Sequence, residues 1–319
     1  MIRRRQRRRG DVAFAVVRNL IEAMSKPQPR PNSGNSSVAD TLRQAVAHHQ
    51  RGQLNEADAL YRRVLDVEAG HFDALHLYGV LKHQRGEHAE ALKLIARALE
   101  TNARSAAAHS NYGMVLAILD RHEDALASYD RAITLKPDYA EAFNNRGNAL
   151  RALKRPRDAL ASFERAVAAR PDYAEAFNNR GNSLIDLGRP EDALASYDRA
   201  LAHRPEFVDA LVNRANALRM LGRSRESLVS LERALALNPG LALGHLSHGN
   251  ALLELNQPAG AVQSFDRAIA LTPSAVETLA NRGRALRELE RYSESLSSYD
   301  RALSIKPDAA LLVGTQTTR

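Results

Sequence analysis

Histidine and the absence of cysteine decide which metal and nucleophile chemistry this sequence can support. The 319 residues include eleven histidines and no cysteine, which excludes thiolate metal sites, disulfides and a cysteine nucleophile. His245 and His248 are the only histidines one helical turn apart, a spacing that can place two imidazoles on one metal ion. We favour a packing role for both, because of their place in the repeat described below, and predict no metal site.

Motifs for catalysis are absent from the sequence as well. It contains no glycine-rich phosphate-binding loop, no G-x-S-x-G nucleophile motif and no H-E-x-x-H zinc motif. The glycines recur instead at a regular interval. We therefore predict that the chain is not an enzyme, that it has no catalytic residues and that it uses no cofactor.

Asparagine is the polar residue whose spacing does point to a chemistry. Two series run along the chain in multiples of 34 residues. The first series is Asn111, Asn145, Asn179, Asn213 and Asn281, and the second is Asn148, Asn182, Asn216 and Asn250. An amide side chain offers two donors and one acceptor oxygen, which matches the donors and acceptors of an extended peptide backbone. The two series are our candidate peptide-binding residues.

The elements that must position these amides follow from a 34-residue period. Eight units cover residues 38–309, preceded by an arm and linker at 1–37 and followed by a short tail at 310–319. The units are 38–71, 72–105, 106–139, 140–173, 174–207, 208–241, 242–275 and 276–309. The units at 140 and 174 both begin A-E-A-F-N-N-R-G-N, which indicates a recent duplication.

Each unit carries a packing pattern that predicts two antiparallel helices. Positions 8 and 20 are small, position 24 is large in every unit, and position 27 is alanine in seven of them. Proline at position 32 of six units ends the second helix, because it lacks the amide donor and clashes with the preceding turn. Asp138, Asp172 and Ser274 are each followed three residues later by glutamate, which predicts capping boxes. Ala69 and Ala103 replace the proline in units 1 and 2, so we expect less sharply defined junctions there.

These residues make the chain resemble the tetratricopeptide-repeat family across residues 38–309. The resemblance implies an all-α fold, a right-handed α-solenoid of eight helix-turn-helix repeats whose first helices line a concave groove. It also implies a protein-protein interaction scaffold that binds an extended peptide segment in that groove. In this family positions 2, 5, 6, 9, 12 and 13 face the groove, whereas positions 4 and 7, occupied by His245 and His248, face the hairpin interior.

The two asparagine series fall at groove positions 6 and 9, and they admit two interpretations. They contact a bound peptide, or they form hydrogen bonds between adjacent repeats, as the family consensus also allows. The position-6 series is similar to the asparagine ladder of O-linked N-acetylglucosamine transferases. Our alternative function is therefore the substrate-recognition region of such a glycosyltransferase, whose catalytic domain is missing or encoded separately.

Two arginine series accompany the asparagines. Arg151, Arg219 and Arg287 stand at position 12, where they could select acidic side chains of a partner. The interpretation we favour is pairing with nearby acids such as Glu288 or Asp186. The second series, at position 7, is Arg146, Arg180, Arg214 and Arg282. These arginines either lie over the aromatic side chains of position 24 or pair with the acids of position 25.

The net charge of +8 is concentrated at the amino terminus. Residues 1–37 hold nine basic and two acidic side chains, a balance of +7, and the remainder holds 36 basic and 35 acidic side chains. An unstructured arm or a misassigned start is our first interpretation, contact of Arg3–Arg9 with nucleic acid or an anionic membrane is the second, and an export signal is the last. No apolar run approaches the length of a membrane span, and we expect a cytoplasmic protein.

The carboxyl-terminal end departs from the family pattern. Only ten residues follow the eighth unit, and Gly314 with three threonines forms a poor helix. The helix that usually covers the last repeat is therefore not expected, and one face of repeat 8 should be exposed. Self-association through this uncapped repeat, a truncated chain and a missing downstream domain are the alternatives.

Overall fold

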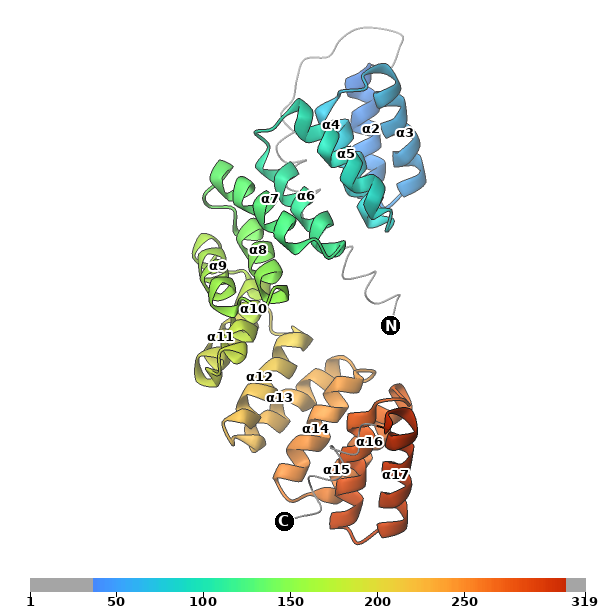
Figure 1. Cartoon of the computed structure of the whole chain (residues 1–319), viewed down its shortest axis with the longest axis vertical. Coiled ribbons are helices and arrows are strands. Elements are labelled where there is room, and N and C mark those ends of the chain that lie inside the picture. Colours follow the sequence, from blue (N-terminus) through green and yellow to red (C-terminus); the bar gives the residue numbers. More distant parts are fainter. Residues whose placement is uncertain (1–36, 308–319) are drawn as a thin grey trace. The chain divides into compact units, whose positions relative to one another are not determined.

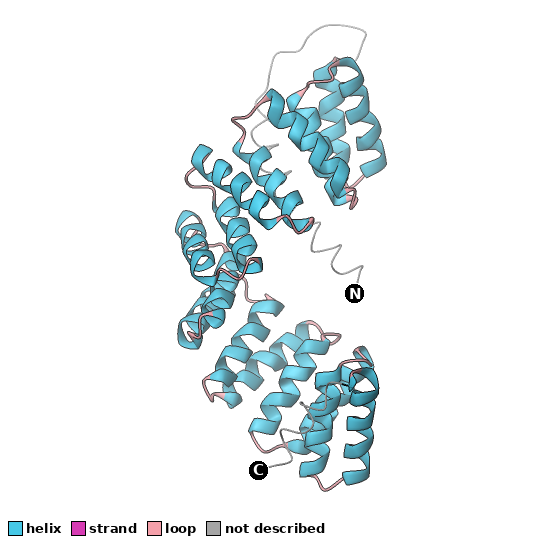
Figure 2. Cartoon of the chain, in the orientation of Figure 1, coloured by secondary structure: helices cyan, strands magenta, loops and turns pink. Residues whose placement is uncertain are grey.

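The computed structural model describes residues 37–307, and in this range every regular element is an α-helix. Sixteen helices follow one another between residues 37 and 307, and no strand occurs there. Figure 2 shows the helices joined by short loops. The all-α fold expected from the sequence is confirmed. The basic arm, Arg3–Arg9 included, and the tail at 310–319 lie outside the described residues.

Helices alternate between first and second members of each repeat. The first helices are α2 (Val38–Gln50), α4 (Phe72–Gln84), α6 (Ala106–Ile118), α8 (Ala140–Ala152), α10 (Ala174–Asp186), α12 (Val208–Met220), α14 (Ala242–Glu254) and α16 (Val276–Glu288). The second helices are α3 (Leu54–Val67), α5 (His88–Thr101), α7 (His122–Leu135), α9 (Pro156–Ala169), α11 (Pro190–His203), α13 (Ser224–Leu237), α15 (Pro258–Leu271) and α17 (Tyr292–Ile305). Every first helix occupies positions 1–13 of its repeat, and every second helix occupies positions 17–30.

The chain divides into two compact units that meet in sequence between Arg155 and Pro156. Unit 1 contains α2 to α8, and unit 2 contains α9 to α17 (Figure 1). Within each unit the two helices of a repeat pack as a hairpin, as α6 does with α7 and α14 with α15. Successive first helices also contact each other, as α4 does with α6 and α12 with α14. We call the surface formed in each unit by positions 2, 5, 6, 9, 12 and 13 the first-helix face.

Close helix packing depends on the small residue at position 8. A Cβ atom added to Gly113 would lie 2.8 Å from Tyr129, and one added to Gly181 would lie 2.5 Å from Tyr197. Those distances are shorter than van der Waals contact, so the aromatic ring of position 24 occupies the space that a side chain would need. Large and small positions interlock, as the sequence pattern predicts.

The loop between the two helices of each repeat has a left-handed residue at position 15. Glycine takes this conformation in four repeats, with φ between 70° and 82° at Gly52, Gly86, Gly188 and Gly222. Asp120, Lys154, Asn256 and Glu290 take it in the other four, with φ between 56° and 60°. A residue with a Cβ atom adopts this conformation at a cost in free energy. The sequence pattern did not reveal this requirement, because position 15 is glycine in only four of the eight repeats.

The helix ends differ in part from what the sequence predicts. Helices α3 and α5 end at position 30 like all other second helices, so the replacement of proline by Ala69 and Ala103 does not move the helix end. The predicted capping boxes do not form, because the N-cap residues of α8, α10 and α16 lie one position later and provide no capping side chain. Side-chain caps occur instead at Ser37, His71 and Ser105, each of which is the residue directly before a first helix.

Candidate binding face on the first helices

Position-6 asparagines form hydrogen bonds between neighbouring repeats. In unit 2, Asn213 Nδ2 donates to Asn178 Oδ1 at 2.9 Å, and Asn281 Nδ2 donates to Asn250 Oδ1 at 2.9 Å. In unit 1, Asn111 Nδ2 lies 2.8 Å from His76 Nε2. For these three residues the interpretation as joints between repeats is confirmed.

The remaining position-6 amides accept hydrogen bonds within their own helix. Asn145 Oδ1 accepts from Asn144 Nδ2 at 3.5 Å, and Asn179 Oδ1 accepts from Asn178 Nδ2 at 3.4 Å. Both distances lie at the long limit for a hydrogen bond. Both side chains are half-buried on the first-helix face of their unit, and Asn179 makes a further contact as well.

Position 9 contains the amides with unused hydrogen-bonding groups. Asn182 Oδ1 accepts from the Tyr197 hydroxyl at 2.8 Å, and Asn250 Oδ1 accepts from Asn281, which leaves the Nδ2 groups of Asn182 and Asn250. Asn148 and Asn216 make no hydrogen bond to any residue in the described range 37–307. Asn148 is exposed and Asn216 is half-buried, so each presents a complete amide to a ligand.

Arg219, at position 12, is held by an acid of the next repeat. Its Nη2 and Nε atoms lie 2.6 and 3.0 Å from Glu254 Oε1, and the Ser224 hydroxyl donates to Glu254 Oε2 at 2.5 Å. Burial alone would raise the pKa of Glu254, but the hydrogen bonds from Arg219 and Ser224 hold that pKa below its usual value. The predicted pairing is confirmed for Arg219, with Glu254 as its partner. Arg151 and Arg287 also interact with neighbouring groups.

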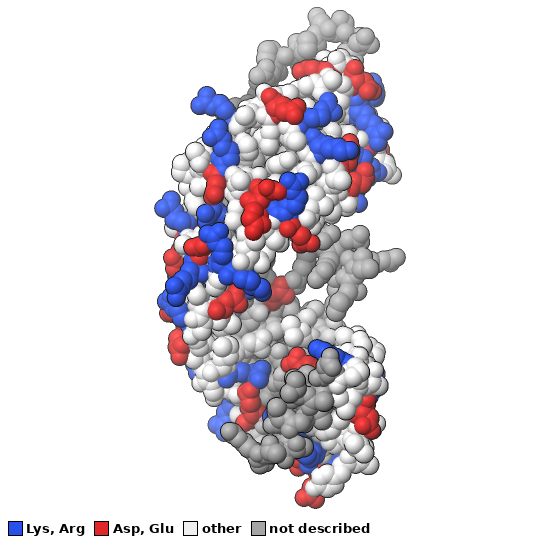
Figure 3. Space-filling view, viewed as in Figure 1, with Lys and Arg blue, Asp and Glu red and all other residues white. Residues whose placement is uncertain are grey.

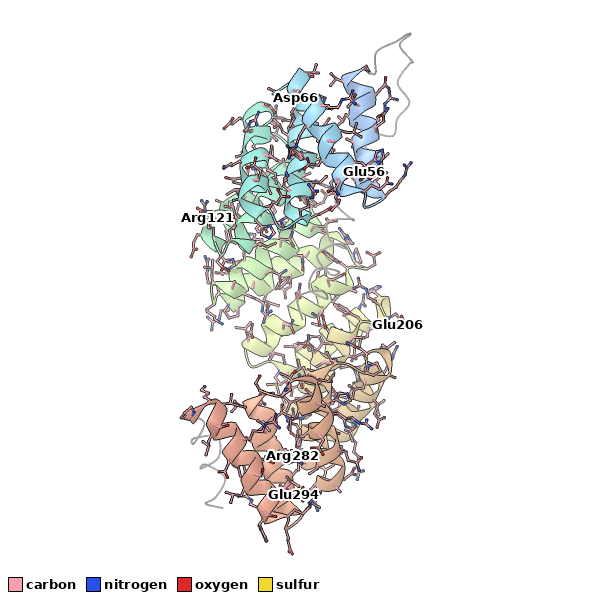
Figure 4. The ribbon with its side chains drawn as sticks, turned by 90° about the vertical axis from the view of Figure 1, so that its right-hand side faces the viewer. Glu56, Asp66, Arg121, Glu206, Arg282 and Glu294 are labelled. Carbon is pink, nitrogen blue, oxygen red and sulfur yellow. The ribbon has the colours of Figure 1, made fainter. Side chains whose placement is uncertain are left out.

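Position-7 arginines join each repeat to the one before it. Arg214 Nε lies 2.6 Å from Asp198 Oδ1 of the preceding second helix, and its Nη1 donates to the Ser230 hydroxyl at 2.7 Å. Arg282, labelled on α16 in Figure 4, makes the same two contacts with Asp266 and Ser298 at 2.6 and 2.7 Å. The ion pair with position 25, one of the two alternatives from the sequence, is therefore correct.

The same contact recurs in the other repeats that carry arginine at position 7. Arg146 Nε lies 2.7 Å from Asp130 Oδ1. Arg180 lies 3.8 Å from Glu164 Oε1 and donates to the Ser196 hydroxyl at 3.2 Å. We call the arginine at position 7 with the acid at position 25 of the preceding repeat the inter-repeat clamp.

The histidine pair considered for metal binding is occupied by neighbouring groups. His245 Nε2 lies 2.9 Å from the Pro239 carbonyl oxygen, and His248 Nδ1 lies 2.9 Å from the Ser264 hydroxyl. His248 occupies position 7, and Ser264 is at position 23, where serines of other repeats accept a hydrogen bond from the position-7 arginine. Burial lowers the pKa of His248. In residues 37–307 no three metal-ligating side chains come together.

His76 supports the joint between repeats 2 and 3 as a neutral side chain. It is completely buried, and burial lowers its pKa to about 4. Its Nε2 atom faces Asn111, and its Nδ1 atom has no hydrogen-bond partner. Protonating this ring would place a charge in the core of unit 1, so the joint should weaken in acid.

A pocket of about 200 Å³ opens on the first-helix face of unit 1 between repeats 3 and 4. We call it the repeat 3–4 pocket. Its lining consists of Met114, Ala117 and Ile118 from α6, His122 and Tyr129 from α7, and Asn145, Asn148 and Ala149 from α8. Two of the predicted asparagines thus belong to it, but the rest of its lining was not anticipated. The available signal was Met114, which occupies position 9 in the repeat just before the asparagine series begins.

One end of unit 2 carries exposed apolar side chains. Tyr292 and Leu296 of α17 are 64% and 62% exposed, whereas Leu194, which matches Leu296 in repeat 5, is only 8% exposed. Within the described residues no helix packs over this face of α17. The exposed face expected for repeat 8 is therefore present.

The surface of the described residues mixes both signs of charge. On the face drawn in Figure 3, basic and acidic side chains alternate in each unit. No helix in residues 37–307 is both long enough and apolar enough to cross a membrane.

Family models described as tetratricopeptide repeat match most of the sequence. They cover residues 48–112, 104–172, 178–242 and 246–310. No curated protein sequence matches the chain.

Solved structures share the fold. YrrB, described as a tetratricopeptide-repeat protein with an unusual peptide-binding site, is 25% identical, with a TM-score of 0.50, and the match covers 58% of this chain and 95% of that one. The Cut9–Hcn1 complex matches with 14% identity and a TM-score of 0.63, over 88% of this chain and 56% of that one. A repeat protein from Parabacteroides merdae matches with 16% identity and a TM-score of 0.60, over 79% of this chain and all of that one.

Proposed function

The chain belongs to the tetratricopeptide repeat family, and from this premise we propose a non-catalytic scaffold that binds an extended segment of a partner protein along the first-helix face. The observation that carries the proposal is the pair of unused amides, Asn148 in unit 1 and Asn216 in unit 2. Each offers two donors and one acceptor to a peptide backbone. YrrB, whose description names a peptide-binding site, supports the same use of the fold.

The position-6 asparagines have a different role in this proposal. Asn213 and Asn281 already donate to the preceding repeat, so they hold the face in shape and do not contribute those donors to the ligand. Asn182 and Asn250 each accept one hydrogen bond and present their Nδ2 groups. In unit 2 the first-helix face therefore offers donors at position 9 of repeats 5, 6 and 7.

A displayed library of random peptides tests the proposal without knowledge of the natural partner. Peptides enriched on the full chain are measured against Asn148→Ala, Asn216→Ala and the double variant. A neutral hydrogen bond contributes about 1 kcal/mol, or roughly fivefold in affinity, and each amide offers up to three, so a peptide held by one unit should bind about fivefold to a hundredfold more weakly when the amide of that unit is removed. The expected cause is the loss of backbone contacts, so peptides of different sequence should be affected alike.

Asn213→Ala with Asn281→Ala is the matched control, because it also removes two asparagine amides, but ones that already donate to the preceding repeat. This variant should lose thermal stability, while its folded form keeps most of its affinity for the peptides. If the double variant of Asn148 and Asn216 binds all enriched peptides as tightly as the unaltered chain does, the proposal is wrong. A library that yields no binder would also contradict it.

The relation to a sugar transferase stays a separate hypothesis. It predicts that the gene lies beside one encoding a nucleotide-sugar-binding fold, and that this partner glycosylates proteins only when the repeat chain is present. An unrelated gene neighbourhood would count against it.

A further inference from the structure

The repeat 3–4 pocket has the size of one aromatic side chain. Its volume is about 200 Å³, and Met114, Ala117 and Ile118 form an apolar wall. A cavity of about 150 Å³ lined by apolar side chains is known to bind benzene. The pocket therefore accommodates an aromatic ring together with a small substituent.

Tyr129 lines this pocket, and its hydroxyl group has no hydrogen-bond partner among residues 37–307. It makes no hydrogen bond to any described residue, and it is not sealed from solvent. The equivalent Tyr197 hydroxyl donates to Asn182 at position 9, and the Tyr61 hydroxyl lies 3.1 Å from His49 Nδ1. In repeat 3, position 9 is Met114, whose thioether is a poor acceptor, so the Tyr129 hydroxyl lacks the contact that Asn182 supplies in repeat 5.

The Tyr129 hydroxyl group can both donate and accept a hydrogen bond. A wholly apolar guest would leave it without a partner, whereas a guest with a hydroxyl group can satisfy it.

We propose that the repeat 3–4 pocket receives a tyrosine side chain of the bound segment. The ring lies against Met114, Ala117 and Ile118, and the phenol hydroxyl hydrogen-bonds with the Tyr129 hydroxyl. Asn148 lines the same pocket and holds the backbone next to the inserted tyrosine. The proposal rests on the proposed function and adds sequence selectivity to backbone contacts that have none. The lining contains no acidic residue, so it does not favour a lysine or arginine guest.

Small probes test the pocket directly. The full chain is labelled at its four methionine methyl groups and titrated to millimolar concentration with N-acetyl-tyrosine N-methylamide and with the phenylalanine and leucine analogues. The Met114 methyl resonance should shift and saturate, while that of Met220, exposed on unit 2, stays in place. The tyrosine probe should bind roughly two- to tenfold more tightly than the phenylalanine probe, as expected for one hydrogen bond.

Two variants separate the shape of the pocket from its hydroxyl group. Ala117→Leu fills the space and should abolish the Met114 shift, with an unchanged Met220 resonance and helix content as evidence of folding. Tyr129→Phe keeps the space and should make the tyrosine and phenylalanine probes bind equally. An unmoved Met114 resonance, a leucine probe that binds as tightly as tyrosine, or an Ala117→Leu variant that still binds would each overturn the proposal.

The peptide library distinguishes failure of this inference from failure of the proposed function. On the unaltered chain, enriched peptides should share a tyrosine, and on Ala117→Leu that preference should disappear while peptide binding persists. Enriched peptides without a tyrosine preference would contradict the inference alone. An absence of enriched peptides with a Met114 resonance that still shifts with the tyrosine probe would contradict the proposed function alone.

Discussion

The assignment of Asn213 as a joint between repeats predicts a stability loss on Asn213→Ala. The substitution removes the 2.9 Å hydrogen bond to Asn178 Oδ1, and Asn178 is only 6% exposed. A buried acceptor left without its donor costs about 1–3 kcal/mol. We expect Asn213→Ala to lower the free energy of unfolding of this region by about 2 kcal/mol. Asn213 itself is half-buried, so its removal uncovers little apolar surface and adds little to that loss.

Hydrogen exchange of backbone amides is the suitable assay, because stacked repeats open locally and a single unfolding midpoint averages over them. A loss of about 2 kcal/mol corresponds to roughly thirtyfold faster exchange in α10 and α12. Asn216→Ala, three residues further along α12, should change exchange by less than about 0.5 kcal/mol. The two variants differ only in whether the removed amide had a partner.

A double-mutant cycle with Asn178→Ala isolates the pair. The coupling free energy should be about 1 kcal/mol, because both single variants lose the same hydrogen bond. If Asn213→Ala and Asn216→Ala accelerate exchange equally, or if the coupling is absent, the division of the asparagines into joints and ligand contacts is refuted.

Three further predictions concern other contacts. Arg214→Met should destabilise unit 2 by about 1 kcal/mol in urea titrations, since the Arg214 side chain is only 24% exposed and also donates to Ser230. Arg223→Met removes an ion pair in which both side chains are about half exposed, and it should cause no measurable change. Glu290→Gly should raise the melting temperature by relieving a left-handed φ of 60°, a gain of about 0.5–1 kcal/mol, and a lower melting temperature would contradict this reasoning. His76 prefers the neutral form in the folded state, so its contribution is complete above about pH 6.5 and decreases as the pH falls toward 4. At pH 5 the loss is about 2 kcal/mol, and His76→Asn, which places the residue of repeats 4 and 5 at this position, should remove that part of the pH dependence of unfolding.

The helical architecture was predictable because the same pattern of small and large residues recurs in every repeat. Gly113 with Tyr129 and Gly181 with Tyr197 are separate instances of one contact, and eight copies leave little ambiguity about the period. The clamp was predictable only as one of two alternatives. Arginine at position 7 can reach an aromatic ring or an acid, and only the positions of the helices decide which is closer.

The roles of individual asparagines were not predictable from the sequence. Asn213 and Asn216 lie on the same side of one helix and belong to equally regular series. They differ because an acceptor of the preceding repeat, Asn178, lies opposite the first and none lies opposite the second. The N-cap prediction failed because the helix begins one residue later than the sequence pattern indicates. The N-cap residue of α8 is Tyr139, whose side chain makes no capping hydrogen bond.

The clamp also bears on how such a chain changes length during evolution. Repeats 3 to 8 each have an acid at position 25, and four of them also have an arginine at position 7. A duplicated 34-residue segment that carries both residues brings an arginine for the repeat before it and an acid for the repeat after it. Inserting or deleting a repeat that carries both residues therefore leaves every position-7 arginine with a position-25 acid in the repeat before it. Repeats 4 and 5, which share their first nine residues, are a pair that this rule allows to arise in one step.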